Sequence, residues 1–317
     1  MTDRSWLPLL RRYGSVVVLA LVVVVASVAF DTFATFDNFR NIAIQSSFPA
    51  IVALGMTFVI ISGGIDLSVG SVFALGGVVA AYGSRWGTVP ALGLSLGIAG
   101  VFGLINGLLI ARTRLAPFIV TLATLLAGRG LLLSITEEGS HTYLVPRDSF
   151  FTLLGQGSIF GIGFPVWLTL FLFAVAGIVL HHTGFGQCTF AVGGSEEAAN
   201  LMGLPVVRTK IGVYLLSGLL AGLAGALNAA RLSSGVTILG VGLELDAISA
   251  VVIGGTLLAG GSGHATGTLA GVLLLGVIQN SINQIGTLNS SYQAVISGLF
   301  LVVVITVQTA LGERRTR

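Results

Sequence analysis

The most constraining feature of the chain is a membrane-length apolar run, residues 51–79, that is interrupted near its middle. The interruption contains Gly63, Gly64 and Asp66. Hydrocarbon accommodates an aspartate only where protein or water surrounds it. It accommodates a broken helix only where the freed backbone groups find partners. A break with an acid beside it therefore indicates a transport protein and argues against a passive membrane anchor.

The composition places the chain among polytopic helical membrane proteins. Of its 317 residues, 54% are hydrophobic and 9% are charged. Soluble domains carry about 25% charge, so these charges are too few to coat a soluble globule. The 45 glycines suit membrane helices that pack closely. The net charge of +3 does not indicate nucleic acid, because the basic residues lie beside apolar spans. The single cysteine, Cys188, excludes a disulfide framework.

Apolar stretches of about 20 residues are long enough to span a membrane. The sequence predicts about ten of them in an all-α fold, with no soluble domain of appreciable size and short cytoplasmic tails over about 1–13 and 312–317. The predicted spans are 14–32, 43–62, 69–83, 90–111, 117–134, 163–181, 211–230, 245–260, 265–285 and 292–311.

Lysine and arginine favour the cytoplasmic side of a membrane and so predict the orientation. With the N-terminus in the cytoplasm, most basic residues fall on the inner side, and Arg129 lies within a span. The inner residues are Arg4, Arg11, Arg12, Arg112, Arg114, Arg208, Lys210, Arg314, Arg315 and Arg317. The outer residues are Arg40, Arg85, Arg147 and Arg231. Both termini are therefore predicted to be cytoplasmic.

The longest inner loop contains a short helix with both ends specified. Ser195 is a good N-cap, and the acids Glu196 and Glu197 suit the positive end of a helix. Gly203 suits the left-handed position after the last turn, and Pro205 prevents continuation. Because so short a helix is not stable alone, it must pack on something. It is either a connector resting on its own bundle or an element that fits a groove on a cytoplasmic partner.

Three ordered motifs resemble the ribose-type sugar permeases of ABC importers. Residues 193–203, GGSEEAANLMG, resemble the cytoplasmic coupling segment of ABC-importer permeases. Residues 63–71, GGIDLSVGS, resemble the signature of the ribose-type family. Residues 244–256, ELDAISAVVIGGT, followed by GGSG at 260–263, resemble its late segment. The similarity covers roughly residues 40–310, and within the family the chain is most similar to galactofuranose-type permeases.

The resemblance implies one transmembrane permease domain over residues 1–317, with a coupling loop over about 182–210. It implies a bacterial inner-membrane protein that carries a monosaccharide, galactofuranose or a similar sugar. The expected partners are cytoplasmic ATP-binding subunits, a second permease subunit, identical or different, a periplasmic sugar-binding protein and the lipid bilayer. The only lysine, Lys210, follows Thr209, whereas a P-loop places its lysine after glycine. Energy must therefore come from another polypeptide or an ion gradient, and the resemblance implies that a partner subunit binds ATP and Mg. The chain has no predicted cofactor, catalytic or metal-ligating residue of its own and is not expected to be an enzyme.

Two sets of candidate site residues belong to the coupling helix and the helix break. The coupling set is Gly194, Ser195, Glu196, Glu197, Ala198, Ala199 and Gly203. The break set is Gly63, Gly64, Asp66, Ser68 and Gly70. Asp66 is interpreted either as a cap that accepts amide hydrogens near Ser68 and Val69 or as a gate or coupling residue. The glycines allow the break or close packing.

Two further sets concern the translocation path and the outer face. The path candidates are Arg129, Gln279, Asn280 and Asn283, and the candidates for docking the binding protein are Arg40, Arg85, Arg147 and Arg231. Arg129 either snorkels to the interface or lines the path. The amides either bond other helices or form a hydroxyl-binding lining. Glu244 and Asp246 either open a helix, where acids suit the dipole, or contact the binding protein.

The glycines at GxxxG spacing are expected to pack helices within one subunit rather than across a dimer. They are Gly103, Gly107, Gly218, Gly222, Gly263, Gly267 and Gly271. Other functions compete with a sugar importer: an ion-coupled secondary transporter, an ABC importer of another small solute such as branched-chain amino acids, or a structural membrane scaffold. Secondary transporters usually place paired charges near the membrane midplane, and this chain offers few.

Overall fold

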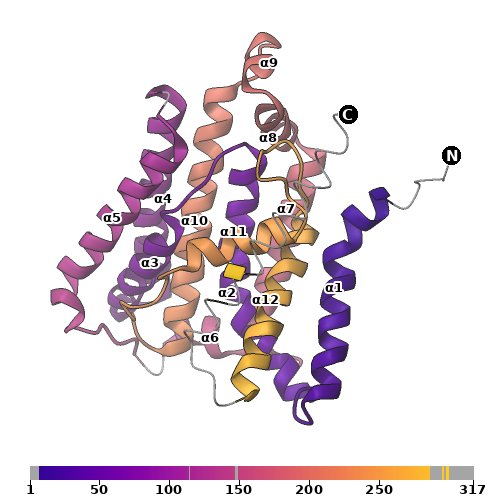
Figure 1. Cartoon of the computed structure of the whole chain (residues 1–317). Coiled ribbons are helices and arrows are strands. Elements are labelled where there is room, and N and C mark those ends of the chain that lie inside the picture. Colours follow the sequence, from indigo (N-terminus) through magenta and orange to yellow (C-terminus); the bar gives the residue numbers. More distant parts are fainter. Residues whose placement is uncertain (1–6, 114, 147–148, 286–294, 296–297, 300–317) are drawn as a thin grey trace.

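A computed structural model describes residues 7–113, 115–146, 149–285, 295 and 298–299. The described chain is a bundle of helices (Figure 1). Its elements, in order, are α1 (Leu7–Ala29), α2 (Phe36–Ile61), α3 (Val69–Gly83), η1 (Ser84–Trp86), α4 (Thr88–Thr113), α5 (Pro117–Ile135), η2 (Glu137–Gly139), α6 (Phe150–Gln156), β1 (Ser158–Ile159), β2 (Ile162–Gly163), α7 (Phe164–His182), α8 (Gly184–Gly194), α9 (Glu196–Leu201), α10 (Val206–Leu232), α11 (Leu243–Ile253) and α12 (Ala265–Ile285).

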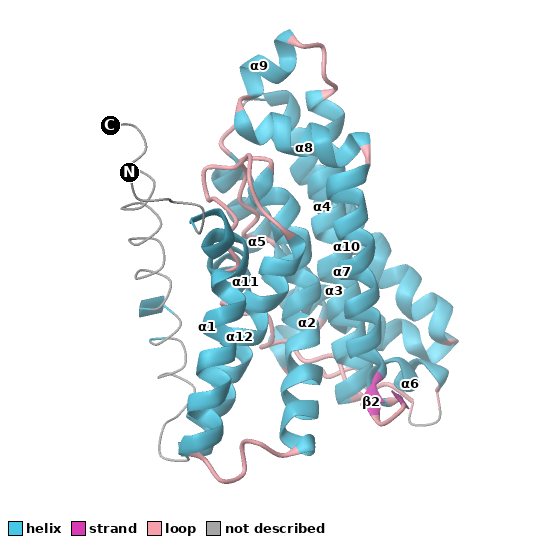
Figure 2. Ribbon diagram, turned by 90° about the vertical axis from the view of Figure 1, so that its right-hand side faces the viewer, coloured by secondary structure: helices cyan, strands magenta, loops and turns pink. Residues whose placement is uncertain are grey.

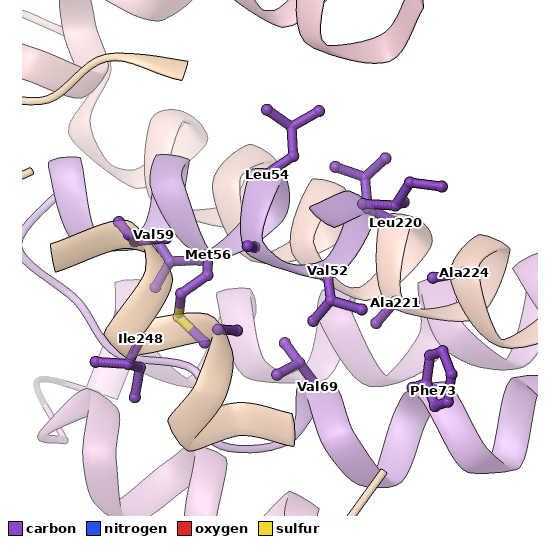
Figure 3. Close-up of a cluster of buried hydrophobic side chains, with 14 of the residues drawn as sticks. Val52, Leu54, Met56, Val59, Val69, Phe73, Leu220, Ala221, Ala224 and Ile248 are labelled. Carbon is purple, nitrogen blue, oxygen red and sulfur yellow. The ribbon is translucent and has the colours of Figure 1, made fainter. Parts of the chain in front are cut away.

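The core of the bundle is built around α10, which lies against α2, α3 and α4. Buried apolar side chains of α10 and three other helices meet in this core, among them Met56 of α2, Val69 of α3, Ala221 of α10 and Ile248 of α11 (Figure 3). Burial of apolar area is worth about 25 cal/mol per Å² between water and an apolar phase. Within a membrane, close packing and hydrogen bonds have to hold such helices together.

The glycine pairs supply that close packing within one subunit, as the sequence predicts. A Cβ placed on Gly103 of α4 would lie 2.5 Å from the carbonyl oxygen of Tyr214 in α10. A Cβ on Gly218 of α10 would lie 2.5 Å from the carbonyl oxygen of Ala99. On α12, a Cβ at Gly271 would overlap the backbone of α11. Glycine is therefore required where these backbones touch.

The prediction of about ten full spans is not confirmed. The nine predicted spans that fall in the described residues each overlap a helix, although the span 245–260 extends past the end of α11 at Ile253, and six of these helices are long and apolar enough to cross a membrane. Those six are α2, α4, α5, α7, α10 and α12. Two others are short: α3 has 15 residues and α11 has 11, against about 20 for a span. The predicted span 292–311 lies outside the described residues, apart from its isolated positions 295 and 298–299.

The two ends of the bundle differ in structure. The end that carries α8 and α9, here called the α9 end, lies opposite the end that carries α6 and the hairpin (Figures 1 and 2). In the hairpin, β1 pairs with β2 in antiparallel register, Ser158 with Gly163 and Ile159 with Ile162. This pairing departs from the all-α prediction, because two-residue strands leave no alternating apolar pattern. The opposite end is called the α6 end below.

Candidate functional site

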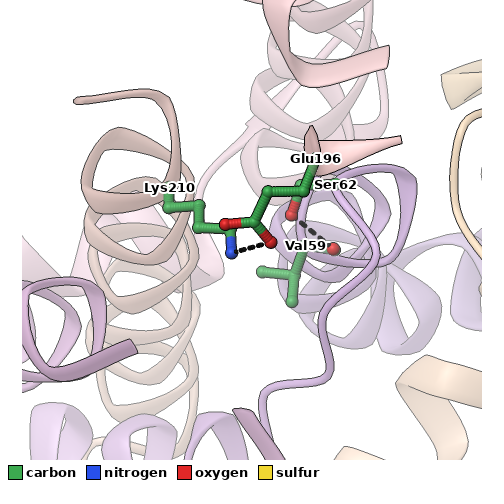
Figure 4. Close-up of polar contacts among 4 residues, drawn as sticks. All are labelled: Val59, Ser62, Glu196 and Lys210. Carbon is green, nitrogen blue, oxygen red and sulfur yellow. Dashed lines mark hydrogen bonds and ion pairs between the residues drawn. The ribbon is translucent and has the colours of Figure 1, made fainter. Parts of the chain in front are cut away.

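The first helix break lies between α2 and α3, where the sequence predicts it. Gly63 has φ +80°, a left-handed conformation that glycine adopts without steric cost. Gly64 has no room for a side chain, because a Cβ there would overlap the Tyr214 hydroxyl of α10. The end of α2 is closed by Ser62, whose hydroxyl donates to the carbonyl of Val59 over 2.7 Å (Figure 4). Both roles predicted for the glycines, the break and the close packing, are therefore present.

Asp66 is completely buried in this break and its carboxylate is hydrogen bonded. The amide and hydroxyl of Ser68 donate to its Oδ1 over 3.0 and 2.6 Å, and the hydroxyl of Ser217 donates to its Oδ2 over 2.8 Å. The Ser68 amide donates to Asp66 as the capping interpretation expects, but Ser68 is itself the N-cap of α3, and Val69 makes no described hydrogen bond to Asp66. The predicted gate role stays a prediction.

A buried polar chain extends from Asp66 across the bundle. Asn106 of α4 donates to the Ser68 hydroxyl over 2.9 Å, and Thr124 of α5 donates to the side-chain carbonyl of Asn106 over 2.8 Å. The break is thus fixed to α4, α5 and α10 by side chains that the sequence analysis did not select. No local pattern marks them, because Ser217 lies 151 residues from Asp66.

The short helix predicted between residues 195 and 203 is α9, with the predicted ends. The Ser195 hydroxyl accepts from the amide of Ala198 over 3.2 Å, and Gly203 has φ +73°. Ala199 is buried, whereas Leu201 at the tip is 90% exposed. Glu196 pairs with Lys210 of α10 over 2.6 Å (Figure 4), a contact that the sequence analysis missed.

The sequence analysis also missed α8, which occupies much of the predicted coupling loop and leads into α9. The fold has two interrupted segments, the break between α2 and α3 and the loop between α11 and α12. The last residues of α8 contact both of them. A Cβ at Gly193 would overlap the Ile61 carbonyl and lie 2.7 Å from the Gly261 amide nitrogen. The Gly261 amide donates to the Ile61 carbonyl over 2.8 Å. A Cβ at Gly260 would lie 2.9 Å from the Cα of Gly63. This contact, here called the glycine junction, joins α8 to the segment after α2 and to the segment between α11 and α12.

Gly70, the last member of the predicted break set, contacts a different part of the chain, the segment before α11 and the first turn of α11. A Cβ at Gly70 would overlap the Gly240 carbonyl and the Glu244 carboxylate. The start of α3 therefore packs directly on the segment that precedes α11. Glu244 and Asp246 lie in the first turn of α11, as one interpretation predicts.

Arg129 contacts the same segment before α11. Its Nη1 donates to the Thr237 carbonyl over 2.7 Å, and its Nη2 reaches the Leu239 carbonyl at 3.5 Å. The snorkelling interpretation does not describe these contacts, since the guanidinium is bound to backbone of the protein. Arg129 is absent from the linings of the two cavities described next, although Leu239 lines one of them.

Asn280 bonds another helix, as one interpretation of the amides expects, whereas their role as a hydroxyl-binding lining stays a prediction. Asn280 exchanges hydrogen bonds of 2.9 and 3.2 Å with Asn38 of α2, and Gln284 donates to Asn280 over 3.0 Å. Gln279, Asn280 and Asn283 also line a cavity of about 210 Å³ between α2, α11 and α12. A second cavity, of about 230 Å³, lies between α2, α3, α10 and the segment before α11.

The predicted docking arginines lie on separate elements. Arg85 is exposed in η1, with its guanidinium 3.7 Å from the ring centroid of Tyr82. Arg40 in α2 and Arg231 at the end of α10 are half-buried, the latter 5.6 Å from the Phe48 ring. Arg147 lies outside the described residues. The three described arginines do not form one cluster of hydrogen bonds or ion pairs.

Comparison with known proteins assigns the family. Residues 38–305 match the family described as branched-chain amino acid transport system / permease component. The chain belongs to this family of transport permeases. Its relatives are permeases and not enzymes. No solved structure matches the chain.

Three relatives illustrate the similarity of this permease. It is 40% identical over 307 residues to the ribose import permease protein of Escherichia coli strain K12, covering 96% of this chain and 94% of that one. It is 40% identical over 296 residues to the L-arabinose transport system permease protein of the same strain, covering 93% and 89%. It is 38% identical over 309 residues to the L-arabinose ABC transporter permease protein of Azospirillum brasilense, covering 97% and 90%.

Proposed function

We propose that this permease is the membrane subunit of an ATP-driven importer of a monosaccharide in a bacterial inner membrane. Cytoplasmic ATP-binding subunits, which hold ATP and Mg, would dock at the α9 end, and a periplasmic binding protein would deliver the sugar to the α6 end. A second permease subunit, identical or different, completes the complex. Both chain termini would then be cytoplasmic.

The observation that carries the proposal is the continuity between α9 and the interrupted helices. The exposed tip of α9 offers Leu201 and Met202, 90% and 67% exposed, to a partner. The helix is tied to α10 by Glu196 and Lys210, and through α8 it leads to the glycine junction. A displacement of α9 by a partner would therefore be felt at both interrupted segments, since packed backbones transmit movement.

The substrate class follows from the relatives that carry sugar names. Ribose and L-arabinose are the first candidates, because similarity to permeases named for these pentoses covers nearly the whole chain. Galactofuranose, expected from the sequence motifs, is a further candidate. The family description names branched-chain amino acids, so leucine is the alternative to test. An ion-coupled transporter is not favoured.

Reconstitution tests the proposal. The permease, its ATP-binding subunit and its binding protein are placed in proteoliposomes, and uptake of ribose, L-arabinose, galactofuranose and leucine is measured. We expect uptake of one of the sugars that requires both ATP and the binding protein. Uptake of leucine alone would overturn the sugar assignment, and uptake driven by a proton or sodium gradient without ATP would overturn the ATP-driven mechanism.

Docking at the α6 end has its own test. Arg85 is the exposed arginine there, and exposed charges steer association more than they set affinity, in a salt-dependent way. We expect Arg85→Glu to slow association of the binding protein several-fold at low ionic strength and to leave association unchanged at high ionic strength. An unchanged rate at both ionic strengths would exclude Arg85 from docking. Labelling of a cysteine at position 85 from the cytoplasmic side would overturn the orientation.

A further inference from the structure

The two cavities have three lining residues in common. Gln45 and Pro49 of α2 and Asp246 of α11 line both the cavity of about 210 Å³ and the cavity of about 230 Å³. The first cavity extends from these residues along α12, and the second extends toward α3 and α10. The two cavities therefore adjoin at Gln45 and Asp246.

The polar groups at this meeting point are not occupied by the described part of the protein. Within that part, no hydrogen-bond donor contacts the Asp246 carboxylate, and the side-chain amides of Gln45 and Gln279 make no hydrogen bond. Asn280, by contrast, is engaged by Asn38 and Gln284. Gln45 is exposed, and Asp246 and Gln279 are half-buried, so a solute can reach all three side chains. Groups that face a cavity unpaired are therefore available to a solute.

Pro49 adds a backbone acceptor at the same place. Proline has no N–H, so it cannot donate to the carbonyl four residues earlier in an α-helix. Here that carbonyl belongs to Gln45, and Pro49 lies inside α2. The meeting point therefore offers a carboxylate and a backbone carbonyl as acceptors, and the Gln45 side-chain amide, which both donates and accepts. Gln279 adds a second such amide in the first cavity.

This set of groups suits a neutral solute rich in hydroxyls. Each hydroxyl donates one hydrogen bond and accepts others, so it can satisfy a carboxylate and an amide at once. Neither cavity is lined by a Lys, Arg or His within the described chain. A phosphate or the carboxylate of an amino acid would therefore lack a cationic partner, and Asp246 would repel it.

We propose that Gln45, Asp246 and Gln279 form a hydroxyl-binding station on the translocation path of a neutral monosaccharide. The inference rests on the proposed function and specifies where the sugar is recognised inside the membrane. It selects sugar over amino acid by the charges of the station. Gln279 was already a path candidate from sequence, whereas Gln45 was not considered and Asp246 was assigned to a helix start or to docking.

The first test is uptake by the reconstituted complex with [14C]ribose and a saturating concentration of loaded binding protein. Asp246→Asn keeps the shape of the side chain and removes its charge, and Gln45→Leu removes an amide. We expect Asp246→Asn to lower the uptake rate by about tenfold to a hundredfold, which corresponds to the loss of one hydrogen bond to a charged group. We expect Gln45→Leu to lower it by up to about tenfold, because the lost hydrogen bond is to a neutral amide. Asp31→Asn is the matched control, because Asp31 is exposed and lines neither cavity.

The outcomes of this test separate the station from the proposed function. Wild-type rates in both variants, in a complex that takes up ribose, would overturn the station alone. A wild-type complex that takes up leucine and no monosaccharide would overturn both. Thermal unfolding and ATPase association are measured on each variant, and a loss of uptake counts for the station only where both remain at the wild-type level.

A second measurement does not depend on transport. In a Cys188→Ser background held in nanodiscs, Gln45→Cys and Gln279→Cys are treated with a small charged thiosulfonate. We expect both to react, since the station faces a hydrated route. Ile119 lies on the apolar surface of α5 and is 58% exposed, and we expect Ile119→Cys to react much more slowly. If positions 45 and 279 react no faster than position 119, the station is sealed and the inference is wrong, and this holds for any substrate.

Discussion

The two interrupted segments of the bundle are built alike and carry their acids differently. Each adjoins a helix too short to span a membrane, α3 or α11, and both meet at the glycine junction. In the first, Asp66 is fully buried and accepts three hydrogen bonds. Near the second, Asp246 lies at the other end of α11 and faces two cavities without a donor among the described residues.

The difference indicates a division of labour. A carboxylate whose oxygens are occupied fixes the backbone around it, because breaking those bonds leaves buried donors unsatisfied. A carboxylate that faces a cavity is available for a solute. Asp66, in the motif at residues 63–71, is therefore structural in this conformation. Asp246, in the motif at residues 244–256, is placed to bind a solute.

The largest effect is expected at the glycine junction, which both segments have in common. In Gly193→Ala the new Cβ overlaps the Ile61 carbonyl, so α8 must shift away from both segments. Overpacking of this kind costs about 1–3 kcal/mol. We expect uptake to fall at least tenfold while ATP hydrolysis persists, measured in proteoliposomes.

The control for the junction is the neighbouring residue. A Cβ at Gly194 would meet nothing within 4 Å, so Gly194→Ala makes the same chemical change without the overlap. Equal uptake by Gly193→Ala and Gly194→Ala would show that the junction does not transmit movement. Both segments would then have to be treated as independent of α8.

The next effect separates the two acids by stability. Asp66→Ala leaves the Ser68 amide and the Ser217 hydroxyl without their acceptor, at about 1–3 kcal/mol for each unsatisfied group. Asp246→Ala removes no described hydrogen bond of the carboxylate. We expect a clear fall in thermal unfolding temperature for Asp66→Ala and little change for Asp246→Ala, followed by tryptophan fluorescence in detergent. Equal shifts for both variants would remove the distinction on which the comparison depends.

These outcomes also show what sequence could provide. The ends of α9 were predictable because Ser195 and Gly203 act on their own turn, and the contacts of Gly103 and Gly218 were predictable because GxxxG spacing allows close approach. The motif at residues 63–71 located the first interrupted segment, whereas the second was predicted as part of the span 245–260. Each of these signals is contained within a few neighbouring residues.

What could not be predicted depends on distant partners or on empty space. Ser217 reaches Asp66 across 151 residues, and nothing near Asp246 in the sequence says that its carboxylate faces a cavity. Span counting failed at α11 for a related reason. The apolar run 245–260 continues through the turn at Gly254 and Gly255, so hydropathy does not distinguish a half-length helix plus a loop from a full span.

A smaller effect on transport is expected at α9. In the proposed mechanism, a displacement of α9 would move both interrupted segments. Glu196→Lys brings two lysines together at Lys210, whereas Glu197 has no ion pair within the described chain. An exposed ion pair is worth about 0–1 kcal/mol, so folding should be retained in Glu196→Lys and Glu197→Lys. We expect both to weaken ATPase association several-fold in pull-down from membranes. Full association and turnover in both variants would contradict docking at α9.

The smallest effect is expected at Arg129, which contacts the segment before α11 that lines the second cavity. Its guanidinium reaches the carbonyls of Thr237 and Leu239, and so holds the segment before α11. A lysine cannot reproduce that fork, so Arg129→Lys should loosen residues 233–242 and leave the surroundings of Asp66 unchanged. We expect faster hydrogen exchange in that segment and uptake lowered a few-fold, with Arg112→Lys at the exposed end of α4 as the control. Leu239 lines a cavity, whereas Asp66 lines neither of the two. If Arg129→Lys speeds hydrogen exchange around Asp66 and not in residues 233–242, Arg129 does not hold the segment before α11. The proposed difference between the surroundings of Asp66 and those of Asp246 would then be wrong.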